Sequence, residues 1–212
     1  MKQRLRVAIL LSITCAAVAA FSNLAQAQKI DVGFGVSTVL APSASSCSGN
    51  CQIPQGLGGG AYPGFNGDVL FWHNLGVGAE VFWRGSQGGG AYAAEQDATY
   101  RPIFYNFNGV YSPKIAHRVY GELVAGVGVM STRLYQCETG SGTGCGIAGG
   151  NTAVAASHHF DADFGGGIKF YVLHGLFVRP EARFYWINND TNFSGSYATR
   201  VGATIGYTFG GH

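Results

Sequence analysis

Hydrophobic and polar residues alternate with a period of two along most of the chain, which is the pattern of β-strands whose two faces meet different surroundings. In one such stretch Arg179, Glu181 and Arg183 share one face, while Phe184 and Trp186 share the other. The alternation predicts eight strands, over residues 29–40, 61–72, 76–86, 98–112, 117–132, 156–171, 175–188 and 196–209. The sequence is therefore expected to form an all-β fold.

The connections between these strands alternate between short and long. The short ones cover residues 73–75, 113–116 and 172–174, and the long ones, rich in Gly, Ser and Asn, cover residues 41–60, 86–97, 133–155 and 189–195. Such an asymmetry is typical of an up-and-down barrel with tight turns at one end and long loops at the other. An even number of strands places both ends of the barrel segment on the side of the short turns.

One face of the predicted strands carries charges of both signs, interleaved with glycines. We expect this face to line a narrow lumen as a charge network, formed by Asp68, Glu80, Arg84, Glu122, Asp161, Asp163, Lys169, Arg179, Glu181, Arg183 and Arg200. Asp31, Asn66, Asn106 and Asn108 fall on the same face.

The composition favours lipid around the apolar face. Charged residues make up only 11% of the chain, against about 25% in an ordinary soluble domain. Aromatic residues are predicted to form two girdles at the strand ends, with Phe71, Trp72, Tyr111, Phe170, Tyr171 and Phe209 near the short turns and Trp83, Tyr100, Trp186 and Tyr197 near the long loops. An arginine facing lipid near the midplane costs about 2–4 kcal/mol, so lipid would fix the register of the strand that carries Arg179 and Arg183.

The first 27 residues have the features of a secretory signal peptide. Lys2, Arg4 and Arg6 precede an apolar stretch too short to span a bilayer, and Ala25 and Ala27 form a small-residue cleavage site. The predicted division is a signal peptide over 1–27 and one barrel over 28–212. Removing three of the 13 basic residues leaves ten against 11 acidic ones, so nucleic acid is not an expected partner.

Four cysteines lie beyond the predicted cleavage site. An even number in an exported chain suggests disulfides. Cys47 with Cys51 and Cys137 with Cys145 would be local loop bridges, and pairing between the two loops is the alternative. Zinc is a weaker interpretation, because no histidine stands at a standard ligand spacing from either pair.

Two segments carry a resemblance to a known family. The run Phe177-Val178-Arg179-Pro180-Glu181-Ala182-Arg183-Phe184-Tyr185 looks like the penultimate strand, and Val201-Gly202-Ala203-Thr204-Ile205-Gly206-Tyr207-Thr208-Phe209 like the last strand, of the small eight-stranded outer-membrane β-barrel proteins. The whole chain after the signal peptide resembles this OmpA/OmpX-like family.

The resemblance implies an eight-stranded antiparallel up-and-down transmembrane β-barrel with short periplasmic turns and long extracellular loops, in the outer membrane of a diderm bacterium. It implies that Ile205, Tyr207 and Phe209 form the signal read by the barrel assembly machinery, although Gly210, Gly211 and His212 follow the final aromatic residue. The peptidoglycan-binding domain of larger relatives is not present in the sequence.

The chemistry-bearing residues favour a non-enzymatic protein without a cofactor. Ser157, His158, His159, Asp161 and Asp163 include the residue types of a nucleophilic site, but neighbours on a strand point to opposite faces. A histidine rim at the short-turn end, formed by His73, His117, His174 and His212, could bind metal or sense pH, yet turn histidines are more often only solvated.

An eight-stranded lumen is just filled by side chains, so we expect a monomer with a structural, membrane-integrity or surface-interaction role. Its expected partners are outer-membrane lipid and lipopolysaccharide, together with the assembly machinery, and any partner of the loops stays open. The competing classes are an outer-membrane enzyme that modifies lipid A, a small pore, and a secreted lipocalin-like ligand carrier.

Overall fold

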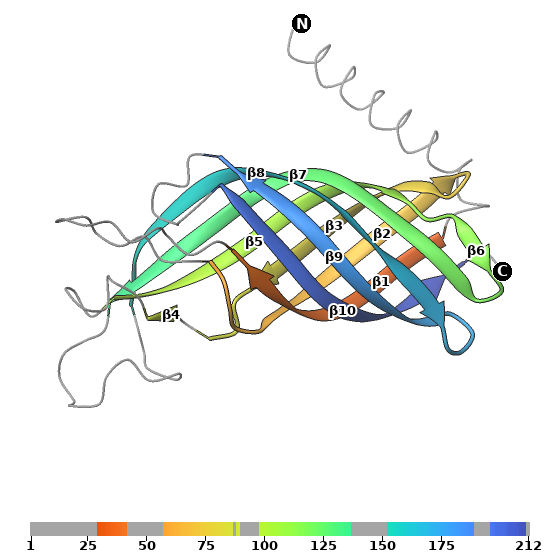
Figure 1. Cartoon of the computed structure of the whole chain (residues 1–212), viewed down its shortest axis with the longest axis horizontal. Coiled ribbons are helices and arrows are strands. Elements are labelled where there is room, and N and C mark those ends of the chain that lie inside the picture. Colours follow the sequence, from red (N-terminus) through yellow and green to blue (C-terminus); the bar gives the residue numbers. More distant parts are fainter. Residues whose placement is uncertain are drawn as a thin grey trace, which may run out of the picture.

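The computed structural model describes residues 29–41, 57–86, 88–89, 98–136, 152–188 and 196–210. Eight long strands form one tilted antiparallel barrel (Figure 1). They are β1 (Lys29–Leu40), β2 (Tyr62–Trp72), β3 (Leu75–Trp83), β5 (Ala98–Tyr111), β7 (Val119–Gln136), β8 (Thr152–Tyr171), β9 (Leu176–Ile187) and β10 (Tyr197–Phe209). The eight predicted strands are confirmed.

The barrel closes by pairing its first long strand with its last. β1 and β10 run antiparallel from Ile30 opposite Phe209 to Leu40 opposite Thr199. Every other neighbouring pair is consecutive along the chain once the short strands are set aside, with β3 beside β5 and β5 beside β7. Closure leaves none of the eight long strands as an open edge, which satisfies the backbone hydrogen bonds that lipid could not.

Several strand boundaries differ from the predicted ones, most of all at the long-loop end of β7 and β8. These two strands stay paired as far as Gln136 opposite Thr152, well beyond the predicted limits of 132 and 156, because their backbone ladder continues past the apolar alternation. β3 instead ends at Trp83, three residues early. Two short strands were not predicted: β4 (Gly88–Gly89) and β6 (Lys114–Ala116), which pairs with the start of β7 inside a predicted turn.

The opposite end carries the short connections, at the right of Figure 1. His73 and Asn74 join β2 to β3 with φ angles of 45° and 66°, as in a two-residue hairpin turn of type I′. Arg118 and Gly175 also have positive φ, at 65° and 80°. Short turns of outer-membrane barrels face the periplasm, so we call this the periplasmic end and the other the extracellular end.

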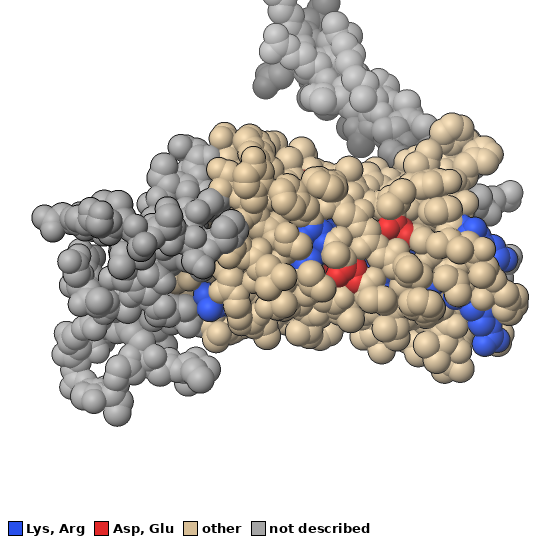
Figure 2. All heavy atoms as spheres, viewed as in Figure 1, with Lys and Arg blue, Asp and Glu red and all other residues tan. Residues whose placement is uncertain are grey.

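The two faces of the wall are divided as the alternation predicts. Phe107 and Val127 point outward with 73% and 52% of their surface exposed, whereas Arg179 points inward and is fully buried. Few charged side chains show on the wall in Figure 2. Apolar residues outside and charged residues inside are the reverse of a water-soluble protein, and they make the barrel wall a transmembrane surface.

The predicted girdles need one correction. Tyr100 and Tyr171 do not face lipid: Tyr100 is buried inside the barrel, and Tyr171 is half-buried with its hydroxyl oxygen 2.8 Å from Thr208 Oγ1. Both lie on the inward parity of their strands, together with Phe104 in β5 and Lys169 in β8. The predicted girdles placed them outside because of their residue type, whereas the period-two alternation fixes their direction.

Within the described ranges, no helix has the length and apolar character needed to cross a bilayer.

Candidate functional site in the barrel interior

Glycines on the inward face make room for the long charged side chains. A Cβ atom built on Gly78 would lie 2.0 Å from Asp68 Oδ1, and one on Gly126 would lie 2.0 Å from Asn108 Oδ1. These side chains lie flat against the backbone of the neighbouring strand, which only glycine permits. The interleaved glycines are therefore part of the site.

A first cluster of charges lies in the periplasmic half of the lumen. Lys169 Nζ is 2.5 Å from Asp31 Oδ2 and 2.5 Å from Glu122 Oε2. Arg179 forms an ion pair with Glu122 and lies 3.5 Å from Asp68 Oδ2. Side chains from strands around the barrel thus meet at one point, where each buried charge has an opposite charge beside it.

A second cluster lies nearer the extracellular end. Glu80 Oε2 is 3.2 Å from Arg183 Nη2 and 3.0 Å from Arg200 Nη2, while Glu80 Oε1 accepts a 3.0 Å hydrogen bond from the Tyr185 hydroxyl. Arg183 also donates a 3.2 Å hydrogen bond to Asp163. Both carboxylate oxygens of Glu80 are therefore in contact with side chains of β9 and β10, across the lumen from β3.

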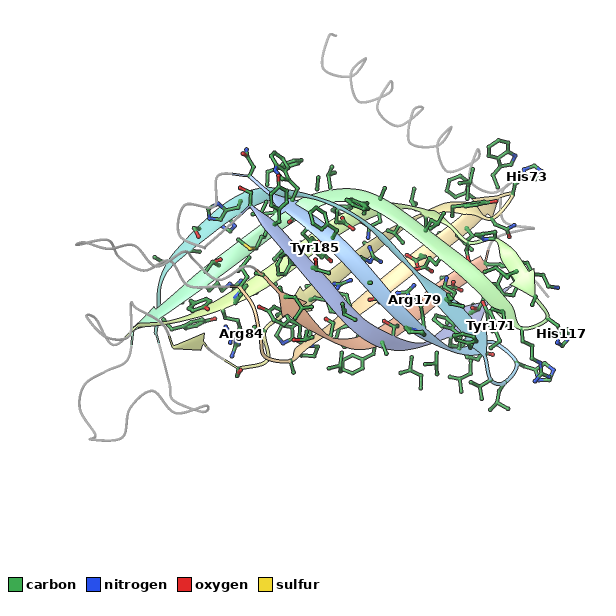
Figure 3. All side chains as sticks on the ribbon, in the orientation of Figure 1. His73, Arg84, His117, Tyr171, Arg179 and Tyr185 are labelled. Carbon is green, nitrogen blue, oxygen red and sulfur yellow. The ribbon has the colours of Figure 1, made fainter. Side chains whose placement is uncertain are left out.

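Glu181 joins the two clusters. Its Oε2 atom lies 2.9 Å from Arg179 Nη2, and its Oε1 atom accepts a hydrogen bond from Arg200 Nη2 at 3.3 Å. The labelled Arg179 and Tyr185 mark the two levels in Figure 3. The network therefore runs as one chain of ion pairs along the barrel axis.

Aromatic rings support two of the cations from within the lumen. The guanidinium carbon of Arg200 lies 3.6 Å from the centroid of the Phe82 ring, and Lys169 Nζ lies 5.4 Å from the centroid of Phe177. Both rings are almost fully buried. Cation–π contacts of this kind strengthen when water is excluded, and they fill space that would otherwise admit water.

An apolar layer that the sequence did not lead us to predict lies in the lumen on the extracellular side of the charges. Phe104 and Tyr185 pack with ring centroids 5.0 Å apart, and the Tyr62 hydroxyl donates a 2.8 Å hydrogen bond to the Leu57 carbonyl. The layer consists of Val39, Leu57, Tyr62, Tyr100, Phe104, Met130, Tyr185, Ile187 and Ala198. Its signal was present, because the inward positions change from charged to apolar toward the long-loop ends.

Two of the predicted network residues, Arg84 and Asp161, take part in no ion pair among the described residues. Arg84 lies near the extracellular rim, at the left of Figure 3, and donates a 3.2 Å hydrogen bond to the Tyr100 hydroxyl. Asp161 is fully buried and accepts a 2.5 Å hydrogen bond from the Asn106 amide. It belongs to the extracellular cluster by position but has no cation beside it in the described part of the chain.

The candidate nucleophilic residues are only partly brought together. His159 Nε2 lies 3.2 Å from Ser157 Oγ, since both stand on the inward face of β8. His158 lies on the opposite face, as the alternation predicts. In the ranges that the structure covers, no three His, Cys, Asp or Glu side chains are grouped so as to hold a metal ion.

Other predicted residues lie on the outer wall or outside the described ranges. Ile205, Tyr207 and Phe209 are exposed on the outward face of β10. Ala25, Ala27 and the four cysteines Cys47, Cys51, Cys137 and Cys145 fall outside the residues that the structure describes, so cleavage and disulfide pairing stay predictions.

The barrel matches solved outer-membrane proteins in fold. A major outer membrane protein from Thermus thermophilus superposes with a TM-score of 0.58 at 10% identity, over 86% of this chain and 100% of that one. Neisserial surface protein A superposes with a TM-score of 0.53 at 9% identity, over 86% and 97% of the two chains. The fold is that of the small outer-membrane β-barrels.

The likeness to these barrels is one of architecture. No protein-family model matches the sequence, and no curated protein matches it either. Because only about one residue in ten is identical, what this chain shares with these proteins is the fold of the closed barrel.

Proposed function

We propose that this chain is a non-enzymatic integral protein of the outer membrane, with a structural, membrane-integrity or surface-interaction role. The observation that carries the proposal is the division of its faces: large apolar side chains cover the outside of a closed barrel, while ion-paired charges fill the inside. A lumen plugged in this way offers no path for solutes, so the functional surfaces are the wall and the two ends.

The proposed location includes export through a cleaved signal peptide over residues 1–27. N-terminal sequencing of protein extracted from outer membranes tests this step. A mature chain that begins at Gln28 is the expected result, and an intact Met1 or a cleavage site within the barrel would contradict it.

The proposed lipid partners are phospholipid and lipopolysaccharide. Arg101 and Arg133 are opposite one another in the β5–β7 pairing, near the extracellular end and on the outward face. Two adjacent cations at this level suit the phosphates of lipopolysaccharide, whereas an arginine at mid-depth would be costly. The outward Ile205, Tyr207 and Phe209 suit recognition by the barrel assembly machinery, and we propose that the barrel is monomeric.

A gene-deletion strain tests the role. We expect loss of the barrel to weaken the outer membrane, seen as greater uptake of an apolar fluorescent dye and greater sensitivity to detergent, with both restored by the wild-type chain. Unchanged barrier properties together with weaker adhesion to surfaces would instead favour the surface-interaction role of the loops.

The enzymatic alternative rests on Ser157 and His159, the pair in hydrogen-bond contact on β8. A hydroxyl beside an imidazole is the arrangement of an activated nucleophile, but the Asp161 carboxylate two residues further on is buried and held by Asn106. A lipid A modification assay with wild-type protein, Ser157→Ala and Asp161→Asn tests it. We expect no activity in any of the three, and wild-type activity abolished by either substitution would overturn the non-enzymatic proposal.

A further inference from the structure

A pocket of about 380 Å³ opens at the periplasmic mouth of the barrel. Its walls come from the start of β1, the β6–β7 hairpin and the β8–β9 turn, and include Lys29, Lys114, Arg118 and Leu173. We call this pocket the basic vestibule. The hydrogen bond between Tyr171 and Thr208 at 2.8 Å lies in its wall. The Lys169–Asp31 ion pair instead belongs to the two charge clusters of the lumen, which we call the plug.

The charge of the basic vestibule is positive and uncompensated. Among the described residues, no Asp or Glu lines the pocket, and no ion pair involves Lys29, Lys114 or Arg118. Lys29 Nζ instead lies 5.2 Å from the centroid of the Tyr120 ring. Figure 2 shows Lys and Arg without acidic neighbours at this end of the visible face. The four buried cations of the plug are all ion-paired, so the vestibule is electrostatically distinct from it.

Exposed aliphatic side chains lie on the elements that form the pocket wall. Leu173, in the β8–β9 turn, and Ile115, in β6, have 66% and 63% of their surface exposed, and Val172 is also exposed. Exposed aliphatic residues beside unpaired cations suit the boundary of a bilayer, where the aliphatic groups meet acyl chains and the cations meet headgroup phosphates. A soluble periplasmic anion would match the cations but leave the aliphatic side chains in water.

We propose that the basic vestibule binds the phosphate of an anionic phospholipid of the periplasmic leaflet. Lys29, Lys114 and Arg118 hold the phosphate, and Leu173 contacts the adjoining acyl chain. The inference rests on the membrane orientation in the proposed function, because only short turns on the periplasmic side place this pocket at phospholipid headgroups. Each cation near an anionic surface is worth roughly a fivefold change in affinity, so loss of all three lowers affinity by about 100-fold.

The test is native mass spectrometry of the folded barrel in detergent, titrated with phosphatidylglycerol, phosphatidylcholine or inorganic phosphate. We expect one phosphatidylglycerol bound in preference to phosphatidylcholine, and this preference lost in the triple variant Lys29→Gln, Lys114→Gln, Arg118→Gln. The control is Arg84→Gln, which removes a cation at the extracellular rim and retains the preference.

Two results would overturn the lipid site. Equal binding of phosphatidylglycerol to the wild type and the triple variant would show that the vestibule is not the site. Binding of inorganic phosphate as tight as that of phosphatidylglycerol would show that the pocket takes a free anion rather than a lipid.

A gel run with and without boiling accompanies each variant and separates the possible failures. A barrel that shifts on heating but shows no lipid preference refutes the vestibule proposal alone. A wild-type chain that never shifts refutes the membrane barrel on which the proposed function depends.

Discussion

Arg200 donates a hydrogen bond to Glu181 at 3.3 Å and crosses from β10 to its neighbour β9 inside the barrel. Because Glu181 also lies 2.9 Å from Arg179, one carboxylate compensates cations of both clusters. The two halves of the plug are therefore coupled electrostatically, and the effect of losing Glu181 is expected to exceed that of losing a carboxylate with one partner.

The first prediction concerns this bridging carboxylate. Glu181→Gln keeps the shape of the side chain but leaves Arg179 and Arg200 with less compensating charge, and removing one partner of a buried pair costs about 3–5 kcal/mol. We expect the free energy of unfolding in urea, measured in lipid vesicles, to fall by about this amount. Arg133→Gln, an exposed change that also removes one charge, should alter it by less than about 0.5 kcal/mol. Equal unfolding midpoints for both variants would contradict the network.

The second prediction concerns the glycines that admit the network. Gly126→Ala would place a Cβ atom 2.4 Å from the Phe107 carbonyl oxygen, so the backbone must shift, at a cost of about 1–3 kcal/mol. Gly67→Ala is the control, since its Cβ would meet only the Asp31 carbonyl oxygen at 3.6 Å. Folding yield and unfolding midpoint should fall for Gly126→Ala alone. A loss of the same size for Gly67→Ala would mean that glycine matters for a reason other than space.

The third prediction concerns conductance. The apolar layer, the two ion clusters and the Tyr171–Thr208 contact fill successive levels of the lumen. The purified barrel added to a planar bilayer should therefore give no regular current steps. Boiled protein added to the same bilayer is the control, and the two recordings should not differ. Reproducible single-channel steps from the folded barrel would show that the plug opens and would favour the small-pore class.

Much of this architecture can be predicted from the alternation alone. Residues such as Glu181 and Arg183 share a parity, and that parity decides their face whichever strand lies next to them. Partners across the barrel could not be predicted, because the contact of Glu80 with Arg200 spans 120 positions and depends on closure and register. Tyr100 is absent from the girdle because its inward parity in β5 fixes its direction, whatever its residue type.

The apolar layer shows the same limit at the level of the site. Phe104 and Tyr185 come from strands that are not neighbours in the barrel, so no local pattern predicts that their rings meet. Leu57 joins them from outside any strand. Arg84 has the right parity for the network, but its strand ends at Trp83, and it lies at the rim instead.

The fourth prediction concerns the lipid-facing wall. Phe107→Arg puts a cation on the outer wall, where phenylalanine is 73% exposed; in lipid this costs about 2–4 kcal/mol near the midplane, whereas in water it would be nearly neutral. Phe107→Leu is the apolar control. We expect the arginine variant to fold less completely into vesicles and to unfold at lower urea, with the control close to wild type.

The most direct measurement is the migration of the wild-type chain in an SDS gel, with and without boiling, after membrane fractionation. A lipid-embedded closed barrel resists SDS until heated, so we predict a band in the outer-membrane fraction that moves to a different position on boiling. A chain that stays in the soluble fraction without detergent, and migrates identically in both samples, would contradict the transmembrane barrel.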